Sequence, residues 1–190
     1  MKKSNVLTTI FIVFLALVLL TVGLLSDYIF KYVEMAIYPD GYYELVVKYS
    51  KEYSVPTALT FAVIKVESDF DTNTESSAGA LGLMQIMPST YEWLAKTKFA
   101  ETPNVSLLYT PEINIKYGTY YLQYLYERFD YSWEKAIIAY NWGEGNFKSF
   151  IEEHGYTEGD YDSIPVTETR NYVKKVLHHW KKYDMLYDNI

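Results

Sequence analysis

The sequence predicts a mainly α-helical globular domain preceded by one membrane-spanning helix. Positions 6–25 form an uncharged run of 20 residues in which Leu, Val, Ile and Phe dominate. At about 1.5 Å per residue, a helix of this length spans the hydrocarbon core of a bilayer. From residue 41 onward the apolar residues recur at helical spacing, and only a short piece at 79–87 suggests a strand. We therefore expect a mainly α fold with at most a small β-element.

Residues 1–26 are predicted to be an uncleaved signal-anchor. Lys2 and Lys3 precede the apolar run and Asp27 follows it, so the positive-inside tendency keeps the N-terminus in the cytoplasm. The alternative is a cleaved signal peptide, whose apolar region is usually about 7–15 residues long and is followed by small residues. Here the run has 20 residues and ends in Leu24-Leu25-Ser26, which favours the anchor. We expect a single-pass protein of the cell membrane whose remaining residues lie on the extracytoplasmic side.

Residues 27–40 are predicted to form a juxtamembrane helical stalk, and residues 41–190 a single globular domain. The 164 residues after the anchor are enough to bury a core. They carry 24 acidic and 15 basic residues, and this formal charge of −9 argues against a nucleic-acid partner. Because the chain has no cysteine, disulfides, Cys-zinc sites, iron–sulfur clusters and thiol nucleophiles are excluded.

Proline residues and capping hydroxyls mark where the helices of the domain are expected to begin. Pro56 suits a first helical turn, and apolar residues follow it at helical spacing. A loop rich in polar residues and glycine then runs from Asp69 to Gly82. Later helices are expected to begin at Pro88, at Thr110-Pro111-Glu112 with a threonine cap, after a capping Ser132 and near Thr167; the one after Ser132 is expected to stop at Gly143.

Glu67 is the first residue that suggests chemistry. It ends the helix that begins at Pro56 and lies four residues after Val63, at the margin of an apolar stripe. A carboxyl group facing a cleft next to apolar surface has its charged form disfavoured, which raises its pKa toward that of a general acid. The alternative is a solvated glutamate at a helix end.

Two further motifs suggest a polar ligand. Gln85 is a hydrogen-bond donor and acceptor within the apolar segment 79–88, whose glycines Gly79 and Gly82 allow positive φ angles. In 139–143 the sequence Ala-Tyr-Asn-Trp-Gly places two aromatic residues around an amide, a composition that suits stacking on sugar rings. The alternatives are a tight turn backed by a core strand and a packed helix C-terminus.

A fourth motif, Glu168-Thr169-Arg170-Asn171-Tyr172-Val173, could aim a tyrosine hydroxyl at a site or belong to a plain amphipathic helix. Together with Glu67-Ser68, with Gly82 to Pro88 and with 139–143, in this order, it resembles the catalytic domain of soluble lytic transglycosylases, glycoside hydrolase family 23. The resemblance covers about residues 41–182. It implies a lysozyme-like α+β fold, mainly α, and makes residues 41–190 the catalytic domain.

The resemblance also implies roles for individual residues. Glu67 matches the family's single catalytic acid/base. Ser76 matches a serine hydrogen-bonded to that glutamate, and Tyr172 matches a tyrosine whose hydroxyl points at it. The residues expected to contact substrate are Ser76, Met84, Gln85, Tyr140, Asn141 and Tyr172.

The implied reaction cleaves the β-1,4 bond between N-acetylmuramic acid and N-acetylglucosamine and forms a 1,6-anhydromuramyl end. No cofactor and no metal is expected, and the expected partners are peptidoglycan glycan strands and, through residues 6–25, the membrane. One alternative is hydrolysis by a lysozyme-type muramidase, in which Asp69, Asp71 or Glu75 activates water. Another is a catalytically silent wall-binding or scaffold module.

Overall fold

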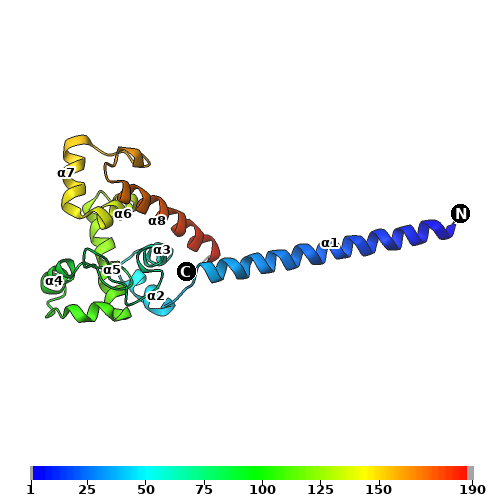
Figure 1. The fold of residues 1–190 in the computed structure, drawn as a ribbon, viewed down its shortest axis with the longest axis horizontal. Coiled ribbons are helices and arrows are strands. Elements are labelled where there is room, and N and C mark those ends of the chain that lie inside the picture. The colour runs from blue at the N-terminus through cyan, green and yellow to red at the C-terminus, as the bar shows by residue number, and fades with distance from the viewer. Residues whose placement is uncertain (1, 188–190) are drawn as a thin grey trace. The chain divides into compact units, whose positions relative to one another are not determined.

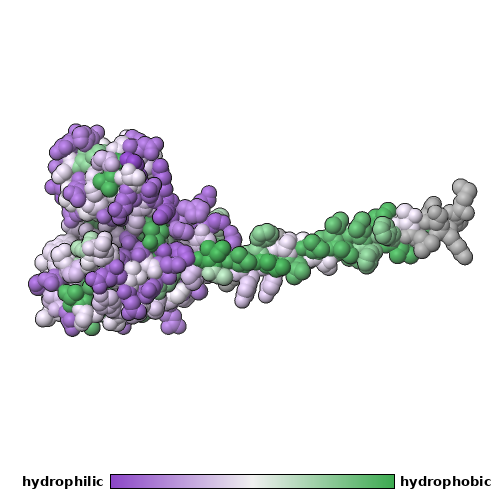
Figure 2. All heavy atoms as spheres, viewed as in Figure 1, coloured by the Kyte–Doolittle hydropathy of each residue, from purple (hydrophilic) through white to green (hydrophobic). Residues whose placement is uncertain are grey.

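The computed structural model describes residues 2–187, and the chain divides into two units between Pro39 and Asp40. The first unit is a single helix, α1 (Lys2–Ile37), which passes without a break through the predicted anchor and stalk. Figure 2 shows apolar side chains exposed along it. Its segment Thr8–Glu34 is long and apolar enough to cross a membrane, a property that signal sequences share.

The second unit is built from helices joined by short connections (Figure 1). In order these are α2 (Tyr43–Glu52), α3 (Thr57–Ser68), α4 (Pro88–Thr97), the 3₁₀ helix η1 (Val105–Tyr109), α5 (Pro111–Arg128), α6 (Trp133–Trp142), α7 (Glu144–His154), the 3₁₀ helix η2 (Tyr161–Ser163) and α8 (Thr167–Leu186). Within residues 2–187 the β structure consists of two isolated antiparallel bridges, Glu75 to Leu81 and Leu81 to Ile86. The prediction of a mainly α fold with a small β-element is confirmed.

The core of this unit surrounds α3. Residues 57–64 of α3 are all buried, so the helix is enclosed on every side over its first two turns. It packs along α8 and against α2, while α6 packs against both α5 and α8. A helix that is enclosed in this way places its last turn at a position fixed by its neighbours. Glu67 lies in that last turn.

Local sequence signals account for most helix ends. Pro88 and Pro111 occupy first-turn positions, and the Ser132 hydroxyl accepts a hydrogen bond from the backbone N–H of Lys135 at 3.2 Å. Gly143 follows α6 with φ of 91°, a conformation that L side chains rarely adopt. The expected cap by Thr110 is wrong, because in the described structure its hydroxyl accepts no capping hydrogen bond.

Candidate active site

Two helices position the central pair of the site. Glu67 ends α3 and Tyr172 lies in the second turn of α8, the helix that packs along α3. The Tyr172 hydroxyl donates a hydrogen bond of 2.6 Å to Oε1 of Glu67. The tyrosine is only 7% exposed, so packing fixes the direction of its hydroxyl. The carboxyl group is therefore held in one orientation.

The surroundings raise the pKa of Glu67 to about 7. Burial is the largest cause, because it disfavours the carboxylate. The hydrogen bond from Tyr172 lowers the pKa, and the negative charge of Glu168 raises it again. A carboxyl group with a pKa near 7 can donate a proton and take it back at neutral pH.

Glu67 lies in a hollow of about 300 Å³ between α3, α6 and α8. Its lining residues are Val66, Glu67, Asn141, Glu168, Asn171, Tyr172 and Lys175. A second hollow, of about 240 Å³, has a more aromatic lining: Gln85, Ile86, Met87, Thr90, Tyr121, Tyr140, Asn141, Trp142 and Gly143. Since Asn141 lines both, the two hollows are neighbouring sections of one groove, and we call them the glutamate section and the aromatic section.

Asn141 is oriented by a residue that the sequence analysis did not select. The hydroxyl of Thr169, which is 1% exposed, donates a hydrogen bond of 2.8 Å to Oδ1 of Asn141. This contact joins the C-terminal end of α6 to the first turn of α8. The Nδ2 group is then the polar group of this side chain that is left to donate to a ligand.

Tyr140 and Gln85 fix the loop that forms one wall of the aromatic section. The Tyr140 hydroxyl donates to the backbone carbonyl of Met84 at 2.7 Å. Gln85 has φ of 49°, and its Nε2 donates to the carbonyls of Thr74 at 3.0 Å and Gly82 at 2.9 Å. Both amide hydrogens of Gln85 therefore tie the loop together, although the residue does line the groove.

Two residues expected to contact substrate are placed differently. The Met84 side chain is 0% exposed and packs against Gly118, beneath the groove, so only its backbone takes part in the site. Oγ of Ser76 accepts a hydrogen bond of 2.9 Å from the backbone N–H of Ala80. In the described part of the chain no hydrogen bond joins Ser76 to Glu67, and Ser76 does not line either section.

Asn114 supports the loop from α5 and was not selected from the sequence. It is 0% exposed, and its Nδ2 donates to the carbonyls of Leu81 at 2.8 Å and Leu108 at 2.7 Å. Its Oδ1 accepts from the backbone N–H of Met84 at 2.7 Å. A polar residue three positions before a buried Tyr117 on the same helix was the available signal.

The carboxylates considered for activating water lie elsewhere. Asp69 is paired with Lys65, Asp71 accepts from the backbone N–H of Asn73 at 2.9 Å, and Glu75 accepts from the Tyr109 hydroxyl at 3.2 Å. Neither groove section has any of the three in its lining. Glu168 is the second carboxylate in the glutamate section.

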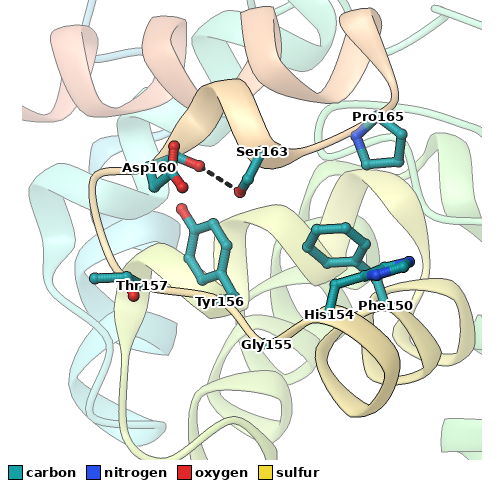
Figure 3. Close-up of a pocket in the computed structure, with 8 residues that line it drawn as sticks. All are labelled: Phe150, His154, Gly155, Tyr156, Thr157, Asp160, Ser163 and Pro165. Carbon is teal, nitrogen blue, oxygen red and sulfur yellow. Dashed lines mark hydrogen bonds between the residues drawn. The ribbon is translucent and has the colours of Figure 1, made fainter.

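A separate hollow of about 450 Å³ lies between α7 and the segment around η2 (Figure 3). Phe150, His154 and Pro165 lie on one side of it, and Thr157 and Asp160 on the other. It shares no lining residue with the groove. Residues 2–187 contain no group of three His, Asp or Glu side chains placed to hold a metal ion.

Comparison with known proteins gives one family. The model of the transglycosylase SLT domain matches residues 44–162, a range that includes Glu67, Gln85 and Asn141. The soluble lytic murein transglycosylase of Escherichia coli K12 is 36% identical over 159 residues, which cover 79% of this chain and 23% of that protein. The membrane-bound lytic murein transglycosylase C of Actinobacillus pleuropneumoniae serotype 5b is 31% identical over 165 residues, covering 75% of this chain and 45% of that protein.

Solved structures show the same similarity. The crystal structure of the 70 kDa soluble lytic transglycosylase of Escherichia coli superposes with a TM-score of 0.73 and 33% identity, over 79% of this chain and 25% of that one. A complex of the 70 kDa soluble lytic transglycosylase with bulgecin A gives a TM-score of 0.74 and 32% identity, over 80% of this chain and 25% of that one. The chain thus spans about a quarter of the length of these soluble relatives.

Proposed function

The chain belongs to the transglycosylase SLT domain family, and from this premise we propose that it is a peptidoglycan lytic transglycosylase. It cleaves the β-1,4 bond between N-acetylmuramic acid and N-acetylglucosamine and leaves a 1,6-anhydromuramyl end. The observation that supports this most directly is Glu67, a carboxyl group with a pKa near 7 held by Tyr172 in a groove.

Glu67 serves as both acid and base in the proposed mechanism. Protonated Glu67 gives its proton to the glycosidic oxygen as the bond from C1 to that oxygen breaks, and an oxocarbenium-like state develops. The carboxylate then takes the proton of the C6 hydroxyl on the same muramyl residue, and that oxygen forms the new bond to C1. Glu67 ends protonated as it began, and no water is consumed. The nucleophile is already attached to the reacting sugar, so a second carboxylate is not needed to position it.

The remaining groove residues hold the glycan. Asn141 lies where the two sections meet, and its Nδ2 donates a hydrogen bond to a sugar substituent. Tyr121, Tyr140 and Trp142 give the aromatic section the flat apolar surfaces on which sugar rings stack. Gln85 supports this wall and borders the ligand. Tyr172 keeps the carboxyl group of Glu67 in place.

The same proposal places the protein at the membrane. Helix α1 has the length and composition of a membrane span, and two lysines precede its apolar run. Some relatives are named membrane-bound lytic murein transglycosylases. We expect α1 to be retained as a single-pass anchor, with the catalytic unit on the extracytoplasmic side. A C-terminal tag found on a shortened, soluble product would contradict this.

The products of digestion test the proposed activity. The full 190-residue chain in detergent is incubated with purified peptidoglycan, and the fragments are analysed by mass spectrometry. Anhydromuramyl ends, lighter than reducing ends by one water, are expected. Glu67→Gln should reduce their formation by about 10²- to 10⁴-fold, whereas the exposed Glu75→Gln, outside the groove, serves as the matched control.

Two other outcomes have defined meanings. Reducing ends in place of anhydro ends indicate hydrolysis, for which Glu168 in the glutamate section is the available second carboxylate. Equal digestion by the wild type and Glu67→Gln removes Glu67 from its assigned role. Binding to peptidoglycan without any cleavage by the wild type indicates a silent wall-binding module.

A further inference from the structure

Helix α8 carries a polar, mainly basic face beside the groove. Asn171, Lys174, Lys175, His178 and His179 line an open hollow of about 330 Å³. These positions follow the spacing i, i+3, i+4, i+7 and i+8, which places them on one side of a helix. We call this surface the α8 strip.

The α8 strip continues the groove. Asn171 and Lys175 line this hollow and also line the glutamate section, next to Glu67. Asn141 joins the glutamate section to the aromatic section on its other side. A ligand that fills the glutamate section therefore reaches Asn171 and Lys175 without leaving the surface of the groove.

Lys175 differs from its neighbours in its charge environment. Lys174 is paired with Asp162 at 3.4 Å and lies over the ring of Tyr161. Among the described residues, the exposed Lys175 makes no hydrogen bond and no ion pair through its Nζ. The chain as a whole has a net charge of −7, so an available cation inside the groove stands out against an acidic protein.

The position of Glu168 limits where an anionic group can lie. Its carboxylate shares the glutamate section with Glu67 and repels negative charge there. Lys175 and Asn171 offer donors at the other end of that section, an ammonium and an amide. An anion is therefore favoured at the α8 strip and disfavoured next to the reacting carboxyl group.

We propose that the α8 strip, through Lys175 and Asn171, binds a carboxylate of the peptide stem on the muramyl residue. This inference rests on the proposed function. The stem is attached through a lactyl group at C3 of the same sugar whose C1 reacts, so it leaves the ring close to Glu67. The strip thus makes the protein prefer peptide-bearing glycan over glycan that has lost its peptides.

The test compares two glycans with the full 190-residue chain in detergent. One is intact peptidoglycan and the other is peptidoglycan whose stems an amidase has removed; both are first freed of phosphate-containing wall polymers. Initial rates of anhydro-end formation are measured at low ionic strength for the wild type, Lys175→Gln and Lys181→Gln. Lys181 is an exposed lysine of α8 outside the strip, so its substitution makes the same charge change. The readout is the ratio of the two rates, which cancels a general effect on the chemistry.

The wild type should prefer the peptide-bearing glycan, and Lys175→Gln should lower the ratio about fivefold, as expected for one partly exposed ion pair. Lys181→Gln should keep the wild-type ratio, and amidating the stem carboxylates should abolish the difference between wild type and Lys175→Gln. An unchanged ratio in Lys175→Gln, or an equal fall in both variants, would overturn the proposal.

Two more arms separate the possible errors. If the Lys175→Gln effect appears only on walls that retain their phosphate polymers, the anion is a phosphate and the carboxylate assignment is wrong. If the wild type releases no anhydro ends from either glycan, the proposed function itself fails. Failure of the α8-strip inference alone leaves anhydro ends in every sample with equal ratios.

Discussion

Tyr172 and Glu67 are 105 positions apart in the chain, and the tyrosine hydroxyl lies 2.6 Å from Oε1 of the glutamate. This contact opposes the burial that raises the pKa of Glu67, while the charge of Glu168 acts in the same direction as burial. The pKa near 7 is thus a balance of three causes. Each can be changed by one substitution.

The first prediction concerns Tyr172→Phe. Loss of the hydrogen bond removes the influence that lowers the pKa of Glu67, so this pKa should rise above about 7. Because Glu67 must be protonated to act as an acid, the alkaline limb of kcat/KM against pH should move upward. The maximal rate should fall about tenfold, the effect of losing one hydrogen bond to the reacting group. Tyr156→Phe, whose hydroxyl bonds to Glu134 instead, is the control and should not shift the limb.

The second prediction concerns Glu168→Gln and has the opposite sign. Removing this negative charge should lower the pKa of Glu67, because the charge raises it in the wild type. The alkaline limb of kcat/KM should therefore move to lower pH, as measured by rates of anhydro-end formation across pH 5–9. Glu158→Gln, an exposed loop residue, makes the same charge change away from the groove. A shift of the same size in both variants would point to net charge instead of a local effect.

The third prediction concerns stability. The folded-state pKa of Glu67, about 7, lies above the ordinary value of 4.5, so the folded protein binds more protons than the unfolded chain between these values. Stability should therefore fall as pH rises from about 4.5 to 7, by at most about 3 kcal/mol. Glu67→Gln removes this loss, so it should unfold at a higher temperature than the wild type at pH 8 relative to their difference at pH 4. Circular dichroism melts at the two pH values measure this, and an equal difference at both would contradict it.

The fourth prediction concerns Asn114→Ala. The substitution leaves three buried backbone groups, at Leu81, Leu108 and Met84, without their partner. The free energy of unfolding should fall by about 3–5 kcal/mol, since a buried unsatisfied group costs about 1–3 kcal/mol. Asn73→Ala, at an exposed loop position, should change it by less than about 0.5 kcal/mol. Denaturant titration of the three proteins decides between these values.

The helix boundaries could be predicted wherever local chemistry sets them. Proline in the first turn at Pro88 and Pro111, the serine cap at Ser132 and the positive φ of Gly143 all act within a few residues. Helix α7 was not predicted, because it follows Gly143 directly and most of its residues are polar. Only Phe147 and Phe150 of α7 are buried, so its helical form depends on packing against α6.

The site could be predicted from local residues only in part. Spacing alone could not separate Glu67 from a solvated glutamate; the resemblance to a family singled it out. The neighbours that raise its pKa come from α8, through tertiary packing that no local pattern encodes. Thr169 and Asn114 were missed for the same reason, since each acts on a segment at least 28 positions away.

Met84 shows the opposite error. It was expected among the substrate contacts because it adjoins Gln85 in the same motif, but its side chain points into the core. The space that it occupies exists because α5 has no side chain at Gly118, a property of a distant helix. Motif membership placed the segment at the groove correctly and could not say which face each residue presents.

Gly118 sets a limit on how this protein can be made more stable. Replacing a glycine inside a helix by alanine ordinarily stabilises it by about 1 kcal/mol. Here the new Cβ would lie 2.5 Å from Sδ and 2.8 Å from Cβ of Met84, too close for either to stay in place. Met84 would be pushed toward the loop that carries Gln85, and the wall of the groove would shift with it. At this position thermostability and the shape of the binding surface cannot be optimised independently.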